Sequence, residues 1–469
     1  MSAPASVAEG AAPERRSRIL HEPLLPTLWW LAWPTLLTNV LQSSINIADL
    51  FLIGGLPPAL ATDSLAALGM SIQAIIMVVV LLSGVSVGTT ALVARMVGAG
   101  QRAEANTIAR QSMVLAALFG LGFIVPVGVV IAPGLLRTLG ATGQVLEIGV
   151  PFLRLSFVGM PLVAMNFVAA MALRGAGDTR TPLRVLLVAN VFNIGISYML
   201  IYGVGPFPRM NALGAAAGNM LAGLLSFILY QRALASGRHG LQIDWSERPV
   251  LTRGHTRRVL SIGAPTGFQY FMLNLSGVLV YRLVSATPDH TLAVAAYAIG
   301  VQVRNVAVWV AQSFGAAASA MVGQNLGAQQ LDRAARAGWT ATGSAVALLV
   351  GIALLIGFGA PTLVRLFNDD PTTVRIGADY LRTLALSFPA LAVALTVAGA
   401  LQGAGATKIP MVTNLFTQLV LAVPAAYYFG IVRGGGTSAI WWSLAASTVV
   451  YAALNAAAYA HGGWRYRPV

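Results

Sequence analysis

The stretch Arg174-Gly-Ala-Gly-Asp-Thr-Arg-Thr-Pro182 occurs a second time, in altered form, as Gln402-Gly-Ala-Gly-Ala-Thr-Lys-Ile-Pro410. Nearly half of the 469-residue chain separates the two copies. Each copy lies between two long apolar segments. A motif that recurs at such a spacing indicates an internal duplication.

Less common residues repeat at nearly the same spacing. The pairs are Arg137 with Arg365, Phe152-Leu-Arg154 with Tyr380-Leu-Arg382, Pro161 with Pro389 and, at a slightly longer offset, Pro34 with Pro265. Matched Arg, Pro and aromatic positions are hard to obtain by chance in an Ala/Gly/Leu-rich sequence. We therefore expect two related halves. Pro161 and Pro389 interrupt helical hydrogen bonding in both halves, and we predict that they are hinges; static kinks are the alternative.

The composition is that of a membrane protein. Apolar residues make up 57% of the chain and charged residues only 9%, whereas a soluble globular protein carries about 25% charged residues. The chain has no cysteine, which excludes disulfides and thiolate chemistry. Its five histidines make no metal-ligand spacing, so we expect neither a metal site nor a cofactor.

Twelve segments are long and apolar enough to be helices that cross a bilayer. They are residues 27–54, 66–95, 106–134, 145–173, 182–204, 211–233, 257–286, 292–325, 331–358, 374–403, 410–432 and 437–461. The predicted division is a disordered cytoplasmic tail (1–25), an N-terminal six-helix bundle (26–233), a basic cytoplasmic linker (234–256), a C-terminal six-helix bundle (257–462) and a short cytoplasmic tail (463–469). Because each half has an even number of spans, we expect an all-α polytopic protein whose bundles are related by a pseudo-two-fold axis along the membrane normal.

The net charge of +14 comes mostly from arginines in short loops between the apolar segments. Most of them fall on the side of the N-terminus, which the positive-inside rule identifies as cytoplasmic. We therefore expect a multi-pass protein of the plasma (bacterial inner) membrane with both termini in the cytoplasm. No concentrated basic patch with interleaved aromatic residues indicates nucleic-acid binding.

Several motifs, taken in order, resemble the MATE (multidrug and toxic compound extrusion) family of the flippase-like transporter superfamily. They are Trp33-Pro34, Ile47-Ala-Asp-Leu-Phe51, Ala94-Arg-Met-Val-Gly-Ala-Gly100, Leu173 to Pro182, Asn190-Val-Phe-Asn193, Leu200-Ile-Tyr-Gly203 and Val322-Gly-Gln-Asn-Leu-Gly-Ala328. The resemblance implies a secondary active multidrug efflux transporter rather than an enzyme. It would exchange organic, mostly cationic, small molecules for a cation by alternating access, with lipid around it, and we expect it to be a monomer.

Asp49 is the only carboxylate well inside a predicted span, and an ionisable residue there is a functional candidate by default. Helical spacing places Asn39, Gln42 and Asn46 on its face. The fifth span carries Asn190, Asn193 and Ser197 on one face, and the sixth carries Asn219. The resemblance implies that Asp49, Asn193 and Asn219 belong to a cation-coupling network, and we include Asn190 and Ser197 because they share a helix face with Asn193. The alternative for each amide is that it only joins helices by hydrogen bonds.

The second half has polar faces without a carboxylate inside a span. With Asn39, Gln42 and Asn46, the predicted substrate-cavity residues are Gln269, Tyr270, Asn274, Gln302, Arg304, Trp309 and Asn414. Aromatic side chains there could stack on a cationic ligand. Arg304 would repel such a ligand, and it indicates instead a carbonyl partner, an anionic substrate or a lipid.

Two departures from the family bear on the coupling ion. One branch uses acids in the seventh and tenth spans, where this chain has Leu273 and Leu391, and another uses an acid where it has Ser197. Sodium needs several oxygen ligands and a proton needs one base, so we favour the proton. Two alternatives are a flippase for lipid-linked precursors and, less favoured, a membrane-embedded prenyl transferase. The latter needs two acidic clusters, and the only adjacent acids are Asp369 and Asp370.

Overall fold

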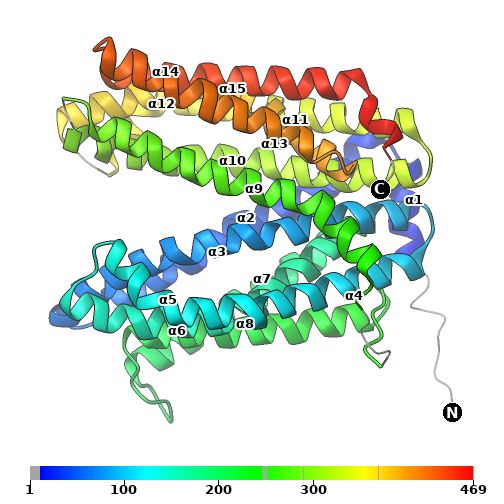
Figure 1. Cartoon of the computed structure of the whole chain (residues 1–469), viewed down its shortest axis with the longest axis horizontal. Coiled ribbons are helices and arrows are strands. Elements are labelled where there is room, and N and C mark those ends of the chain that lie inside the picture. Colours follow the sequence, from blue (N-terminus) through cyan, green and yellow to red (C-terminus); the bar gives the residue numbers. More distant parts are fainter. Residues whose placement is uncertain (1–10, 247–250, 289, 368, 468–469) are drawn as a thin grey trace. The chain divides into compact units, whose positions relative to one another are not determined.

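The computed structural model describes residues 11–246, 251–288, 290–367 and 369–467, which form helices joined by loops, and no strand occurs among them (Figure 1). The helices are α1 (Ala11–His21), α2 (Leu24–Gly54), α3 (Pro58–Gly98), α4 (Arg102–Phe119), η1 (Gly120–Ile124), α5 (Val125–Thr138), α6 (Gly143–Gly175), α7 (Arg180–Tyr202), α8 (Ala212–Ala235), α9 (Arg253–Ser285), α10 (His290–Gly327), α11 (Leu331–Arg365), α12 (Pro371–Gly403), α13 (Lys408–Leu415), η2 (Phe416–Ala422), α14 (Val423–Tyr427), η3 (Tyr428–Val432), α15 (Gly436–His461) and η4 (Gly463–Tyr466).

Eleven helical segments of the described chain are long and apolar enough to cross a membrane. Two of them are composite, because the π-helical turn η1 joins α4 to α5, and η2 and η3 interrupt the segment Lys408–Val432. The predicted seventh span corresponds to α9, which has 33 residues and is long enough but less apolar. Polar residues such as Gln269 and Asn274 account for this. The expected all-α membrane fold, with two sets of six long helices, is confirmed.

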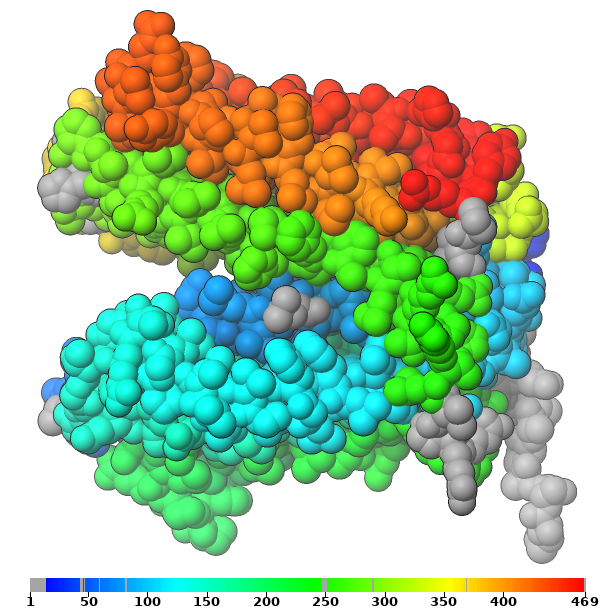
Figure 2. Space-filling model, in the orientation of Figure 1, coloured from blue at the N-terminus to red at the C-terminus, as the bar shows by residue number. Residues whose placement is uncertain are grey.

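The described residues divide into two compact units. Unit 1 contains Pro34–Gly263 with the described part of Met1–Arg18, and unit 2 contains Ala264–Val469 and Ile19–Trp33. The boundaries therefore fall inside α2 and α9, next to the paired Pro34 and Pro265. In unit 2, α15 lies beside the continuous helical segment that contains α13 and α14 (red and orange in Figure 2).

The sequence repeat is reproduced in the packing of each unit. In unit 1, α6 crosses α3 so closely that a Cβ atom on Gly175 would lie 2.8 Å from the carbonyl oxygen of Thr90. In unit 2, Gly403 of α12 meets the backbone of Ser319 in α10 in the same way. Gly403 has the same place in the second copy of the loop motif as Gly175 has in the first, and Ser319 corresponds to Thr90 when the halves are aligned. Close crossing at a small residue is how helices pack without a hydrophobic driving force between them.

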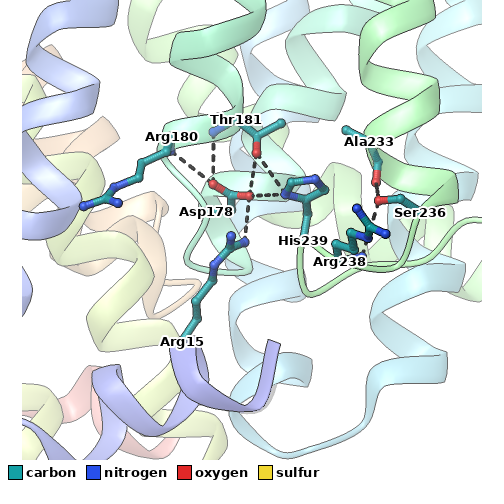
Figure 3. Close-up of polar contacts among 8 residues, drawn as sticks. All are labelled: Arg15, Asp178, Arg180, Thr181, Ala233, Ser236, Arg238 and His239. Carbon is teal, nitrogen blue, oxygen red and sulfur yellow. Dashed lines mark hydrogen bonds and ion pairs between the residues drawn. The ribbon is translucent and has the colours of Figure 1, made fainter. Parts of the chain in front are cut away.

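A buried carboxylate at the start of α7 joins three segments of unit 1 (Figure 3). Asp178 is 2% exposed, and its Oδ1 accepts the backbone N–H groups of Arg180 and Thr181 at 3.1 and 3.0 Å. Its Oδ2 accepts from Arg15 and the Thr181 hydroxyl, both at 2.7 Å, and lies 2.8 Å from His239 Nδ1. Burial alone would raise the pKa of this carboxyl, but His239, Arg15 and Thr181 together lower it well below its usual value.

The N-terminal segment differs from the expected disordered tail, because residues 11–21 form helix α1. Its basic residues have specific partners within unit 1: Arg15 pairs with Asp178, and Arg16 Nη2 donates to the Gly98 carbonyl at 2.9 Å. In unit 2, Ile19 is fully buried. These contacts explain the helix, since an Ala/Pro/Arg-rich composition alone does not predict it.

Candidate functional site

Helix α2 carries a buried carboxylate, Asp49, next to exposed apolar side chains. Asp49 is 3% exposed, whereas the next two residues, Leu50 and Phe51, are 42% and 82% exposed. Since α2 is a candidate membrane span, Leu50 and Phe51 suit a lipid environment, and Asp49 faces the other helices of unit 1. A carboxylate held in this way is stable only with polar partners or water.

The partners of Asp49 come from the fifth and sixth spans, and they form a chain of hydrogen bonds. Asn219 Nδ2 of α8 donates to Asp49 Oδ2 at 2.8 Å. Asn193 Nδ2 of α7 donates to Asn219 Oδ1 at 3.0 Å and lies 3.5 Å from Ser197 Oγ. The structure thus brings together four of the five predicted coupling residues, from three helices, in an order that the sequence did not specify.

Two oxygen atoms of this network can still accept hydrogen bonds. Asp49 Oδ1 and Asn193 Oδ1 are buried and have no hydrogen-bond partner among the described residues. No Lys, Arg or His forms an ion pair with Asp49 in the described part of the chain. A buried carboxylate with one amide donor and a second oxygen without a partner can accept a proton or contact a small cation.

The fifth predicted coupling residue holds the helices in place beside the network. Asn190 is 5% exposed, and its Nδ2 donates to the Leu41 carbonyl of α2 at 2.9 Å. Further along α7, the Tyr202 hydroxyl donates to the Leu52 carbonyl at 2.7 Å. These bonds fix α7 to α2 on both sides of Asp49. Tyr202 was not singled out, although the motif Leu200-Ile-Tyr-Gly203 contains it.

Small residues allow α7 and α8 to approach at the same level. Gly218 of α8 lies directly against Ser197 of α7, so that a Cβ atom there would clash with the serine hydroxyl. The close approach brings the neighbouring Asn219 within reach of Asn193. The small residues Gly214-Ala-Ala-Ala-Gly218, which precede Asn219, therefore permit the helix contact that positions its amide.

The other residues of α2 that were predicted to line the substrate cavity differ in their exposure to solvent. Asn39 is half-buried and Gln42 is exposed. The side chain of Asn46 lies outside the described residues.

In unit 2, the predicted cavity residues fall into separate groups. Gln269 Nε2 of α9 donates to the Tyr451 hydroxyl of α15 at 3.2 Å. Asn414 of α13 is buried, and its Oδ1 has no hydrogen-bond partner among the described residues. Asn274 is exposed, and its amide donates to the Tyr270 carbonyl of its own helix at 2.9 Å. Tyr451 itself was missed, because a single tyrosine in an apolar helix gives no sequence signal.

Three further predicted cavity residues lie on α10. Gln302 is exposed, whereas Arg304 and Trp309 are half-buried.

The two predicted hinge prolines lie in different surroundings. Pro161 of α6 is buried against Gly120, the first residue of η1, so closely that a Cβ on Gly120 would lie 2.8 Å from Pro161 Cα. Pro389 of α12 is half-buried. A π-helical turn next to a proline places two irregular helix segments in contact. The hinge role of both prolines stays a prediction.

No group of three or more His, Cys, Asp or Glu side chains that could hold a metal ion occurs in residues 11–246, 251–288, 290–367 and 369–467. Of the two adjacent acids, Asp370 caps α12, because its Oδ2 accepts the Thr373 N–H at 2.7 Å and the Thr373 hydroxyl at 2.9 Å. Asp370 therefore has a structural role as the N-cap of this helix.

Comparison with known proteins places these helices in context. The MatE family model matches residues 34–199 and again residues 265–428. The two matches begin at Pro34 and Pro265, so the family unit occurs once in each half, in agreement with the repeat.

Two curated relatives and one solved structure illustrate the range of similar proteins. The chain is 27% identical over 457 residues to a probable multidrug resistance protein NorM of Thermotoga maritima, covering 94% of this chain and 93% of the relative. It is 24% identical over 416 residues to an FAD transporter of Shewanella oneidensis, covering 88% and 89%. A crystal structure of a MATE protein in the bent conformation superposes with a TM-score of 0.87 at 21% identity, covering 95% of this chain and 97% of the other.

Proposed function

The chain belongs to the MatE family of membrane transporters, and from this premise we propose that it is a secondary active multidrug exporter driven by an inward flow of cations. Its substrates are small organic molecules, mostly cationic, and the coupling ion is a proton. Alternating access moves the substrate across the membrane. The network around Asp49 is the observation that carries the proposal.

Protonation of Asp49 changes the hydrogen bonds of the network. In the charged state both carboxylate oxygens can only accept hydrogen bonds, and Asn219 donates to one of them at 2.8 Å. In the protonated state the carboxyl becomes a donor as well. Asn193 and Asn219 must then rearrange, and α2, α7 and α8 pack differently around them. A group that binds a proton in one packing and releases it in the other couples the ion to the conformational change.

The ligands near Asp49 favour a proton over sodium. Asp49 is the only carboxylate in the chain of hydrogen bonds, and the remaining members are amides and one hydroxyl. The positions at which relatives carry further acids are Leu273, Leu391 and Ser197 in this chain. A proton needs only the single base Asp49. A sodium ion would have to be bound mostly by uncharged amide and hydroxyl oxygens. A cationic substrate competes with the proton for Asp49, which gives antiport.

The proposal also includes the orientation of the protein in the membrane. Most arginines lie in segments on the side of the N-terminus, so both termini are cytoplasmic, the protein lies in the plasma (bacterial inner) membrane, and it exports towards the opposite side. It works as a monomer with lipid around it, because each half supplies a complete set of six helices.

The test uses everted membrane vesicles with an imposed proton or sodium gradient. Uptake of a fluorescent cationic dye is measured for the wild type, Asp49→Asn and Asp63→Asn. Asp63 of α3 is the matched control, since it is half-buried and takes the same substitution. We expect proton-driven uptake by the wild type and Asp63→Asn and a loss of at least about tenfold for Asp49→Asn. Equal uptake by all three refutes the role of Asp49, and uptake driven only by sodium refutes the choice of ion. Because one relative is named an FAD transporter, flavin nucleotides belong among the substrates tested.

A further inference from the structure

Arg304 of α10 is an arginine inside a membrane-spanning helix without an acidic partner among the described residues. Its Nε is buried and has no hydrogen-bond partner in that part of the chain. An unpaired charge within a bilayer is energetically unfavourable. The position therefore calls for a counter-charge from outside the chain.

Four aromatic rings of unit 2 form a group beside this arginine. They come from four helices: Tyr281 of α9, Tyr297 of α10, Tyr380 of α12 and Trp441 of α15. The ring centroids of Tyr281 and Tyr297 lie 4.6 Å apart, those of Tyr380 and Trp441 lie 4.4 Å apart, and Tyr297 stacks on Trp441 at 5.4 Å. The Arg304 charge interacts with all three tyrosines. We call Arg304 and these four rings the Arg304 cluster.

The base of the Arg304 cluster contains polar atoms that lack partners. Tyr380 and Trp441 are fully buried, and neither the Tyr380 hydroxyl nor the Trp441 Nε1 has a hydrogen-bond partner among the described residues. An indole N–H and a guanidinium can only donate, and a tyrosine hydroxyl donates readily. Buried donors of this kind are destabilising when they have no acceptor. What all three groups lack is an acceptor.

The outer edge of the cluster is accessible. Tyr281 is 39% exposed and Arg304 is half-buried, while Tyr380 and Trp441 lie fully inside. A planar ring can stack on Tyr281 while a negatively charged substituent reaches the guanidinium. Planar, bidentate pairing with carboxylate or phosphate is the interaction that suits arginine best.

We propose that the Arg304 cluster binds the oxyanion, a carboxylate or a phosphate, of an aromatic substrate. The inference deepens the proposed function, on which it rests, because it extends the substrate class from cations to zwitterionic and anionic aromatic molecules. The ring contacts Tyr281, the oxyanion accepts from Arg304, and the Tyr380 hydroxyl and Trp441 N–H complete its hydrogen bonds.

Binding is measured on the full-length purified protein in lipid nanodiscs by fluorescence anisotropy. The probes are a rhodamine dye with a free carboxylate and the methyl ester of the same dye; riboflavin and its monophosphate form the phosphate pair. The wild type is expected to bind the oxyanion-bearing member of at least one pair about tenfold more tightly than the member without the oxyanion. The pair that shows the preference identifies the oxyanion.

The variants attribute that preference. Arg304→Gln should abolish it by weakening the binding of the oxyanion-bearing member, whereas the cationic ester should bind no less tightly, and Tyr380→Phe should reduce the preference about threefold. Arg154→Gln is the control, since Arg154 is also an arginine of a spanning helix but already donates to the Val129 carbonyl at 3.1 Å. If Arg304→Gln does not fold, Arg304→Lys takes its place and should lose most of the preference, because lysine cannot pair bidentately.

Absence of a preference in the wild type overturns the inference, as does a preference that survives in Arg304→Gln or falls equally in Arg154→Gln. Dye export by the wild type is measured separately in vesicles. Failure of export with an intact binding preference contradicts the proposed function alone, and export without any preference contradicts the Arg304 inference alone.

Discussion

The hydrogen bond between Asn219 and Asp49 allows a quantitative test of how the coupling network works. Its length of 2.8 Å and its carboxylate acceptor place it among charge-assisted bonds, which contribute about 1.5–3 kcal/mol. Because about 1.4 kcal/mol corresponds to a factor of ten, Asn219→Ala should slow proton-driven export by about ten- to a hundredfold. Its contact with Asn193 is lost with it, so the upper part of this range is expected.

A double-mutant cycle distinguishes action through Asp49 from a general loss of packing. Initial export rates are measured for the wild type, Asp49→Asn, Asn219→Ala and the double variant at one fixed proton gradient. If Asn219 acts through Asp49, the double variant should be no slower than Asp49→Asn, and the coupling energy should equal the whole effect of Asn219→Ala. Additive effects of the two substitutions would refute the reasoning.

Three other predictions concern stability. Asp178→Ala should lower the melting temperature, because it removes the buried acceptor of Arg15, His239 and the first turn of α7, a loss of about 1.5–3 kcal/mol. Since the pKa of Asp178 is lower in the folded protein than in the unfolded chain, its stabilisation is present above about pH 4 and is lost as pH falls below that; thermal denaturation from pH 6 down to pH 3 should show this in the wild type and not in Asp178→Ala. Gly175→Val should prevent the close crossing of α6 and α3 and reduce the yield of monodisperse protein, measured by size-exclusion chromatography. Tyr202→Phe should cost about 1 kcal/mol through loss of its hydrogen bond to α2, read from thermal unfolding.

Each of these has a clear contrary result. A pH profile of Asp178→Ala that parallels the wild type would show that another group causes the acid instability. The glycine prediction has Gly195→Val as its control, because a Cβ at Gly195 meets no described atom within 4 Å; equal yields for the two variants would contradict the packing argument. An unchanged melting temperature in Tyr202→Phe would mean that the bond to Leu52 contributes nothing.

The duplicated all-helical architecture could be predicted from the sequence because its causes are local. Apolar length defines a span, and the paired prolines and the two copies of the loop motif recur at nearly fixed offsets. The contact of Gly175 with Thr90 and of Gly403 with Ser319 then follows from the same repeat. Helix α1 could not be predicted, because it depends on pairing between Arg15 and Asp178, which are 163 residues apart.

For the group around Asp49, the sequence predicted which residues come together but not which hydrogen bonds join them. Helical spacing identifies the polar faces that contain Asp49 and Asn193, since a buried carboxylate requires polar neighbours. The order of the hydrogen bonds depends on Gly218, which lets α8 approach α7, and that distance is a property of packing. In unit 2, the bond from Gln269 to Tyr451 joins residues 182 positions apart, and neither sequence neighbourhood indicates it.

The most direct test of the exchange of a proton for substrate at Asp49 is to measure the protons released when substrate binds. Purified protein in weakly buffered solution with a pH indicator is mixed with a cationic dye that it binds. At a pH at which Asp49 is protonated before the dye is added, the wild type should release about one proton for each dye molecule bound, and Asp49→Asn should release none for whatever dye it still binds. Proton release by Asp49→Asn equal to that of the wild type would contradict the account.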